Sequence, residues 1–290
     1  MRPAQHFFAA LLLLLAPLGA SAAEAGRTFK DLPYASVSGQ ALALDLYLPA
    51  GSRHAPLVVY LHGGAWNAGD KTQYPAFLVD GGYAVASVDF RSTNDAKFPA
   101  NVHDIKAALR FLRAEAGHYG YRGDRIAIAG ASSGAHLAAL VGTTSGNRDL
   151  EGTEGEHLDQ SSAVQAIVSW FGASNLTTIL AQSTPFGVGV RGPALQRLLG
   201  ASPDEVPELA RLASPVFQLD RHDPPALLLH GDQDRQMPIN QLHELQGAYE
   251  AAGLPVETLI LHGVGHDGGP FFKGEPAERV LRFLRRHLGR

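Results

Sequence analysis

The chain has 290 residues, of which 45% are hydrophobic and 18% are charged. This composition supports a large buried core and excludes disorder as the main state. Lysine and arginine number 24 against 28 aspartate and glutamate residues, which gives a formal charge of -4. Because no run of basic residues lies along any predicted helix, a nucleic-acid partner is not expected. The count of 0 cysteines excludes a disulfide framework and a thiol nucleophile.

Residues 1–23 have the pattern of a secretory signal peptide. Arg2 supplies a basic start, an apolar stretch over 7–18 follows, and small residues over 20–23 fit a cleavage site. The apolar run of about 12 residues is shorter than the ~20 needed to span a bilayer, so a retained anchor is the weaker interpretation. The sequence therefore predicts an exported protein, periplasmic or secreted, without stable membrane insertion after cleavage.

From residue 41 onward, short apolar runs alternate with helical patterns. Residues 41–48 alternate apolar and polar side chains, which predicts an antiparallel strand near the sheet edge. Later apolar runs are rich in β-branched residues, as buried parallel strands are. Between them, apolar residues recur at helical spacing. The predicted parallel strands span 57–61, 83–88, 125–129, 163–170, 226–229 and 257–261, and the predicted helices span 101–115, 133–141, 241–252 and 276–287.

This alternation predicts a single α/β domain over 24–290, with a doubly wound and mostly parallel sheet. Two stretches, about 143–162 and 173–223, do not fit the alternation. The first is polar and acidic, and the second carries prolines around short apolar helices. Because loops this long are usually functional or mobile, we expect them to form a small helical lid over the carboxyl ends of the strands. A surface insertion without function is the alternative.

A candidate nucleophile lies in Gly130-Ala131-Ser132-Ser133-Gly134. This G-x-S-x-G pattern follows a predicted strand and precedes a predicted helix, which is the context of a nucleophile elbow. The turn is tight, so small residues flank Ser132, and the N-terminus of the following helix favours negative charge. Ser133 is the rival hydroxyl, but it does not lie centrally between the two glycines.

A second glycine-rich segment, HGGAW, begins at His62 directly after a predicted strand. An acyl-transfer enzyme of this architecture places its oxyanion loop there. The N–H groups of Gly64 and Ala65, with that of Ser133, would donate to the negative oxygen of a tetrahedral intermediate. We expect His62 to hold the loop by packing and hydrogen bonding. Trp66 is predicted either to bind substrate as a wall of the acyl pocket or to fill the core.

Aspartate and histidine follow the last two predicted strands, in the segments HGDQDRQMP and HGVGH. A serine hydroxyl needs a base with a pKa near neutrality and an acid that holds the base in the right tautomer. The carboxyl ends of strands are where sites form on open α/β sheets. We assign His266 as the base and Asp234 as the acid, with His262 and Asp232 as rivals. His136, one helical turn after the serine, is expected to be buried against the sheet.

In this order and spacing, the segments HGGAW, GASSG, HGDQDRQMP and HGVGHDGG resemble the α/β-hydrolase superfamily. Within it the chain is similar to the hormone-sensitive-lipase-like and bacterial carbohydrate- and feruloyl-esterase-like branch, which includes kynurenine formamidases. The likeness covers about residues 35–288. It implies a catalytic triad of Ser132, Asp234 and His266, an oxyanion hole, and hydrolysis of a carboxylic ester.

Two positions depart from the family pattern. Ala65 stands where many lipase-like members have a third glycine, which favours an esterase or formamidase over a lipase. Asn175 stands where relatives often carry aspartate.

His262 and His266 lie four residues apart beside Asp267, but the intervening glycines oppose the helix that would align them as metal ligands. No metal site and no cofactor are predicted.

These features predict an exported serine esterase that acts on short-chain or carbohydrate-borne acyl esters. Its expected partner is a small-molecule or carbohydrate ester. The alternatives are an arylformamidase, a serine peptidase and a catalytically inactive binding module. The pattern carries no signal for an oligomeric state.

Overall fold

The computed structural model describes residues 25–289 of the chain. The predicted signal peptide lies outside these residues. Within them, no helix combines the length and the apolar composition needed to cross a membrane.

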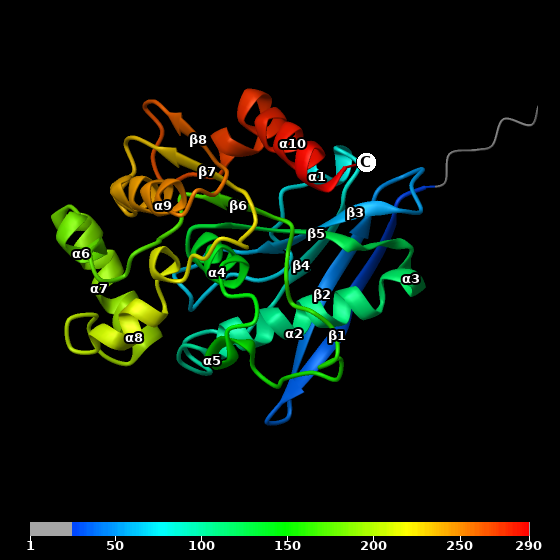
Figure 1. Cartoon of the computed structure of the whole chain (residues 1–290), viewed down its shortest axis with the longest axis horizontal. Helices are drawn as coiled ribbons and strands as arrows, with labels where there is room; N and C mark the ends of the chain where they lie inside the picture. Colours follow the sequence, from blue (N-terminus) through cyan, green and yellow to red (C-terminus); the bar gives the residue numbers. More distant parts are fainter. Residues whose placement is uncertain (1–24, 290) are drawn as a thin grey trace, which may run out of the picture.

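The described residues form an eight-stranded sheet in the order β1-β2-β4-β3-β5-β6-β7-β8 (Figure 1). The first two strands pair antiparallel with their neighbours, and the pairs from β4 to β8 are parallel. The prediction of a mostly parallel α/β sheet is therefore confirmed. The strands are β1 (Arg27–Val37), β2 (Gln40–Leu48), β3 (Ala55–Leu61), β4 (Ala84–Val88), β5 (Tyr121–Ala131), β6 (Ala166–Trp170), β7 (Ala226–Gly231) and β8 (Val256–Leu261).

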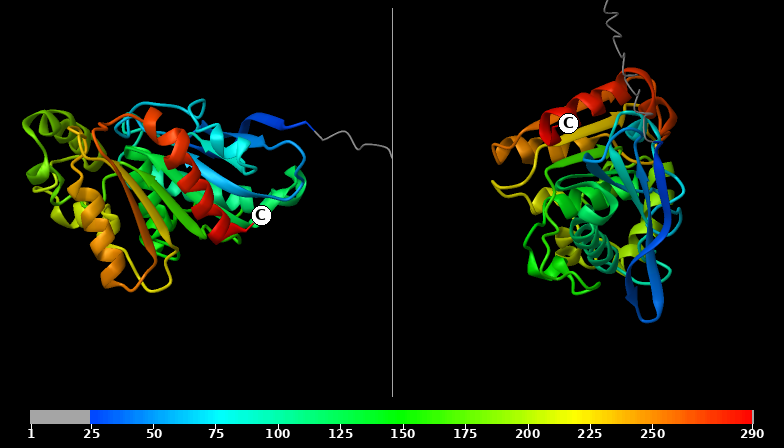
Figure 2. Two further views of the ribbon diagram at one scale, coloured as in Figure 1. Left: turned by 90° about the horizontal axis from the view of Figure 1, so that it is seen from above. Right: turned by 90° about the vertical axis from the view of Figure 1, so that its right-hand side faces the viewer.

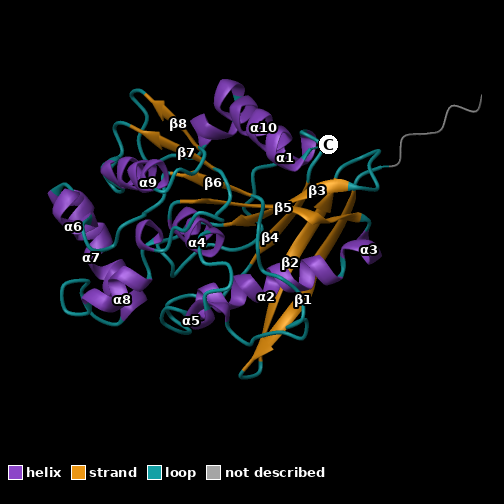
Figure 3. Cartoon of the chain, viewed as in Figure 1, coloured by secondary structure: helices purple, strands orange, loops and turns teal. Residues whose placement is uncertain are grey.

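Helices cover both faces of the sheet (Figures 2 and 3). One face packs against α1 (Phe77–Asp80) and α10 (Gly274–Leu288), and the other packs against α2 (Ala100–Ala114), α4 (Ser133–Gly142) and α9 (Asn240–Ala251). Burial on both faces explains why β3 is apolar throughout and buried at every position. The shorter or peripheral helices are α3 (Ala116–Tyr119), α5 (Arg148–Glu151), α6 (Ile179–Gln182), α7 (Pro185–Leu199) and α8 (Pro207–Leu212).

The edge strand β1 has no counterpart among the predicted strands. It pairs only with β2, and its register shifts twice along its length. Most of its residues are exposed or half-buried, so its sequence lacks both a continuous apolar run and a clean alternation. Edge strands of this kind are stabilised by main-chain pairing more than by side-chain burial, and hydrophobic periodicity does not reveal them.

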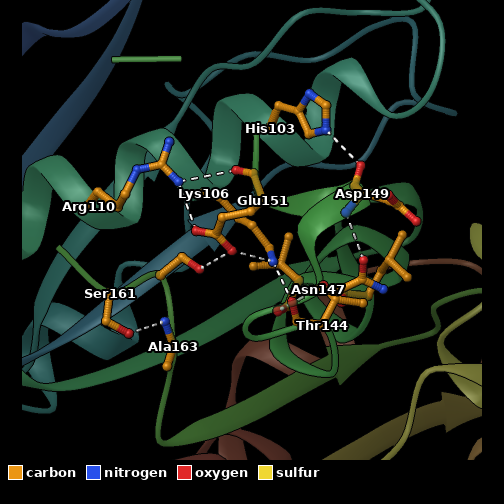
Figure 4. Close-up of polar contacts among 12 residues, drawn as sticks. His103, Lys106, Arg110, Thr144, Asn147, Asp149, Glu151, Ser161 and Ala163 are labelled. Atoms are coloured by element: carbon orange, nitrogen blue, oxygen red, sulfur yellow. Dashed lines mark hydrogen bonds and ion pairs between the residues drawn. The ribbon is translucent and has the colours of Figure 1, made fainter. Parts of the chain in front are cut away.

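The structure packs residues 143–162 against α2, and none of them lines the cavity that contains Ser132. This segment follows α4, and Glu151 anchors it on α2 (Figure 4). Its carboxylate accepts hydrogen bonds from the buried cations Lys106 and Arg110, at 3.0 and 2.9 Å. The expectation that this stretch helps to form a lid is corrected, because its Glu151 pairs with buried cations of α2.

The second stretch, 173–223, does border the carboxyl ends of the strands. It contains α6, α7 and α8. Val190 and Arg191 of α7 line the same cavity as Ser132. This part of the predicted helical insertion therefore forms one wall of the candidate site.

Candidate active site

A strained turn at the end of β5 presents Ser132. The residue has φ 55° and ψ -120°, and α4 begins immediately after it. Positive φ is costly for a residue with a side chain, so the surroundings must hold the turn. A Cβ on Gly130 would lie 2.3 Å from the carbonyl oxygen of Gly134, and one on Gly134 would lie 2.2 Å from that of Leu61. Both glycines of the motif are therefore required by close backbone contact.

The turn brings Ser132 to the imidazole of His266. The distance from Ser132 Oγ to His266 Nε2 is 2.8 Å, and His266 Nδ1 lies 2.6 Å from Asp234 Oδ2. Serine, histidine and aspartate thus form one hydrogen-bonded series across three loops at the carboxyl edge of the sheet. The ring of Phe171 contacts the imidazole edge-on, with 4.8 Å between ring centroids. In this arrangement the imidazole can accept the serine proton while the carboxylate holds its other nitrogen.

The Asp234 carboxylate is fully buried yet well provided with donors. Its Oδ1 accepts hydrogen bonds from the backbone N–H groups of Gln236 and Met237, at 2.9 and 2.8 Å. Burial opposes its ionisation, but hydrogen bonding to His230 and His266 outweighs this effect and holds the pKa of Asp234 well below its usual range. A carboxylate that stays ionised in a water-poor site favours a protonated imidazole beside it.

The rival aspartate and histidine pair with each other instead. His262 Nδ1 lies 2.8 Å from Asp232 Oδ2, and Asp232 Oδ1 accepts a hydrogen bond from the N–H of Gly263. The His262 side chain is 87% exposed, whereas that of His266 is 12% exposed. The structure therefore places Asp234 and His266, and not their rivals, beside the serine.

The loop after β3 is bent by three consecutive residues with positive φ: Gly64 at 119°, Ala65 at 52° and Trp66 at 63°. Gly64 admits no side chain, because a Cβ there would lie 2.0 Å from the carbonyl oxygen of Ala68. Gly64 and Ala65 line the same cavity as Ser132. The third expected donor, Ser133, is the first residue of α4. The candidate oxyanion loop thus borders the serine, as predicted from the order of the motifs.

His62 holds this loop from behind. Its Nδ1 lies 2.8 Å from the carbonyl oxygen of Gly63, and its ring stacks on Phe90 with 4.6 Å between centroids. Gly69 passes so close that a Cβ there would lie 2.5 Å from the same nitrogen. The buried imidazole therefore supports the loop, as expected.

The structure places Trp66 in the core, which agrees with one of its two predicted roles and corrects the other, a wall of the acyl pocket that binds substrate. Its side chain is 2% exposed and does not line the cavity at Ser132. The positive φ of Trp66 turns the indole into the core, where its N–H donates to Nδ1 of His136 at 3.1 Å. His136 in turn places Nε2 2.7 Å from the carbonyl oxygen of Ala213. Trp66 therefore fixes the back of the loop.

The cavity at Ser132 has a volume of about 590 Å³. Aromatic side chains form much of its wall, and two glutamines and one arginine add polar groups. The sequence did not reveal these residues, because no pattern marks which side chains of a strand, loop or insertion face the cavity. They are Tyr60, Gln73, Tyr74, Phe171, Arg191, Gln236 and Phe272.

Known proteins resemble this chain in sequence and in fold. The BD-FAE family model matches residues 44–249. Esterase LipC of Mycobacterium tuberculosis is 31% identical over 226 residues, which cover 74% of this chain and 53% of LipC. Isoprenylcysteine alpha-carbonyl methylesterase ICME of Arabidopsis thaliana is 29% identical over 233 residues, which cover 77% of this chain and 53% of that protein. The chain thus spans about half the length of these curated relatives.

Solved structures share the fold over nearly the whole described chain. A truncated form of a carbohydrate esterase from gut microbiota gives a TM-score of 0.79 at 29% identity, covering 90% of this chain and 95% of that chain. The bifunctional GH43-CE protein of Bacteroides eggerthii gives a TM-score of 0.80 at 34% identity, covering 89% of this chain and 35% of that chain.

The strand order, the helices on both faces and the serine in a strained strand-to-helix turn define an α/β-hydrolase. Within that class the family model covers most of the chain. The chain belongs to the BD-FAE family.

Burial of His136 makes the stability of the fold depend on pH. Burial lowers its pKa from the ordinary 6.5 to about 4, and its Nδ1 accepts the Trp66 proton only while the ring is neutral. Below pH 6.5 His136 is therefore protonated in the unfolded chain, whereas in the folded chain it stays neutral until the pH approaches 4. The free energy of unfolding should fall by about 3 kcal/mol on this account between pH 6.5 and 4.

Urea unfolding at pH 7 and pH 4.5 measures this contribution. His136→Gln should lose less stability on acidification than the wild type does. The exposed His118, changed to Gln, serves as the control and should behave as the wild type. An equal loss in all three proteins would show that the buried imidazole is not the source.

Proposed function

We propose that this chain is a serine hydrolase that cleaves carboxylic esters through an acyl-enzyme intermediate. The observation that carries the proposal is the hydrogen-bonded series from Ser132 through His266 to the buried Asp234, opening into a cavity that Gly64 and Ala65 also line. The names of esterase relatives and of carbohydrate esterase structures support the same reaction class.

In the proposed mechanism, Ser132 Oγ attacks the ester carbonyl carbon while His266 Nε2 takes its proton. The carbonyl oxygen becomes an oxyanion, and the N–H groups of Gly64, Ala65 and Ser133 stabilise it. The intermediate collapses as the imidazolium gives its proton to the departing alcohol oxygen. Water then repeats the sequence on the acyl-enzyme, releasing the acid and free serine. Asp234 orients the imidazole and stabilises its charged form throughout.

We further propose that the acyl group is short or borne by a carbohydrate. Aromatic side chains with glutamines beside them suit a sugar, whose faces are apolar and whose edges are polar. Tyr74 stacks on Tyr47 with 3.9 Å between ring centroids, which holds one such wall rigid. The likeness to a carbohydrate esterase from gut microbiota supports the same class of substrate.

Export is part of the proposal and is supported by the sequence pattern of residues 1–23. Expression of the full chain in a bacterial host should release a protein whose N-terminal residue is Ala23 or Glu24. A mature protein that retains Arg2 and the apolar stretch over 7–18 would contradict export by cleavage.

The preferred acyl length tests the substrate class. The wild type should cleave p-nitrophenyl acetate and butyrate faster than the dodecanoate, and it should release acetate from acetylated xylo-oligosaccharides. N-formylkynurenine and a peptide amide represent the formamidase and peptidase alternatives and should be turned over more slowly than the esters. Ser132→Ala provides the background rate. Preference for the dodecanoate would favour a lipase instead.

Separate substitution of the two aspartates tests which of them is the acid of the triad. Asp234→Asn removes the carboxylate that holds the base and should lower kcat by about 10⁴-fold with p-nitrophenyl butyrate. Asp232→Asn removes an exposed partner of His262 and should leave kcat within about threefold, since exposed pairs contribute little. Circular dichroism of both variants controls for folding. The reverse ranking would move the role of the acid to Asp232.

A further inference from the structure

An unpaired buried cation lies in the wall of the candidate active site. Arg191 is on α7, in the insertion that borders the cavity, and it is 1% exposed. The other buried arginine, Arg110, has the carboxylate of Glu151 at 2.9 Å. Arg91, which is mostly buried, has that of Asp104. Among the described residues, Arg191 has no such carboxylate partner.

The contacts of Arg191 leave part of its guanidinium unused. Nε donates to the backbone carbonyl oxygen of Gln236 at 3.1 Å, and Nη2 lies 3.5 Å from the side-chain oxygen of the same residue. Nη1 is buried and has no hydrogen-bond partner. A buried charge without a counter-ion is costly, and a native fold keeps one only where something else compensates it. Asp234 is the nearby acid, and it is already engaged by His266 and two backbone N–H groups.

Gln236 lies beside this cation and borders the same cavity. Its side chain is partly buried, and it lines the cavity with Arg191, Ser132 and His266. Its amide oxygen makes only the long contact to Nη2, so rotation of this side chain breaks little. A planar carboxylate placed there would meet the fork of guanidinium N–H groups that a neutral amide oxygen satisfies poorly.

We propose that Arg191 binds a carboxylate carried by the substrate, in place of the side-chain amide of Gln236. The inference rests on the proposed esterase function and names its substrate class. That class is carboxylate-bearing esters, with the charge either on the acyl part or on the alcohol part. Acylated acidic sugars and half-esters of dicarboxylic acids both have this chemistry.

Matched neutral and anionic substrates measure the effect on each side of the ester bond. For the alcohol part, the pair is 4-acetoxybenzoate and 4-acetoxybenzamide. For the acyl part, the pair is the mono-p-nitrophenyl ester of adipic acid and p-nitrophenyl hexanoate. Hydrogen bonds to charged groups contribute about 1.5–3 kcal/mol, so kcat/KM should be roughly 10- to 100-fold higher for the anionic member of one pair.

Substitution of Arg191 separates recognition of charge from a structural role. Arg191 also ties α7 to the turn that holds Asp234, so its loss could disturb the catalytic series. A structural role alone would lower the rates on both members of a pair equally. In Arg191→Met the anionic preference should disappear, and Arg191→Lys should retain part of it.

The exposed Arg235 is the matched control, because it does not line the cavity at Ser132. Its guanidinium lies instead over the ring of Phe186, 5.4 Å from the centroid. Arg235→Gln should keep the preference of the wild type. If both Arg191 variants fail to fold, inhibition of the wild type by 4-hydroxybenzoate and adipate, compared with their amides, provides the readout. The carboxylate of at least one pair should then bind at least tenfold more tightly.

Equal kcat/KM for both members of both pairs in the wild type would overturn the proposal, as would an anionic preference that survives in Arg191→Met. Turnover of the neutral esters that depends on Ser132 would leave the esterase function standing in either case. Neutral-ester turnover that persists in Ser132→Ala would instead contradict the proposed function itself.

Discussion

The close contact between the first turn of α4 and the end of β3 is the constraint on which the candidate site depends. Gly134 passes the carbonyl oxygens of Leu61 and His62 so closely that no side chain fits between them. That contact anchors α4 against β3 and holds Ser132 in its strained conformation. Because β3 continues directly into the glycine loop at Gly63 and Gly64, the same contact places the serine beside the candidate oxyanion donors.

Burial separates two aspartate–histidine pairs that the sequence presents in nearly equivalent form. Both pairs span the loops after β7 and β8, and both have imidazole Nδ1 within hydrogen-bond distance of a carboxylate. Asp234 is enclosed and accepts two backbone N–H bonds, whereas Asp232 and His262 lie at the surface. An exposed ion pair is screened by water, while the enclosed one acts with little screening on a neighbouring proton. The enclosed pair is the one that reaches Ser132.

Much of this arrangement could be predicted from residues because it depends on local chemistry. Strands buried on two faces are apolar throughout, and a tight strand-to-helix turn needs small residues around Ser132. The predictions that failed concern features that depend on contacts between distant segments. The orientation of Trp66 depends on an acceptor, His136, that is distant in the sequence. The location of 143–162 depends on the buried cations of α2, and Arg191 lies in a helix of the insertion that carries no motif. Pairings between distant segments leave no periodic signal in the sequence.

Mapping of a covalent adduct shows whether Ser132 is a nucleophile activated by His266. A fluorophosphonate reacts with a serine that is activated by a neighbouring base, and the labelled peptide can be identified by mass spectrometry. We expect a single adduct on Ser132 in the native protein, and a labelling rate that falls by several orders of magnitude in His266→Ala. An adduct on Ser133, or equal labelling of the wild type and Ser132→Ala, would contradict it.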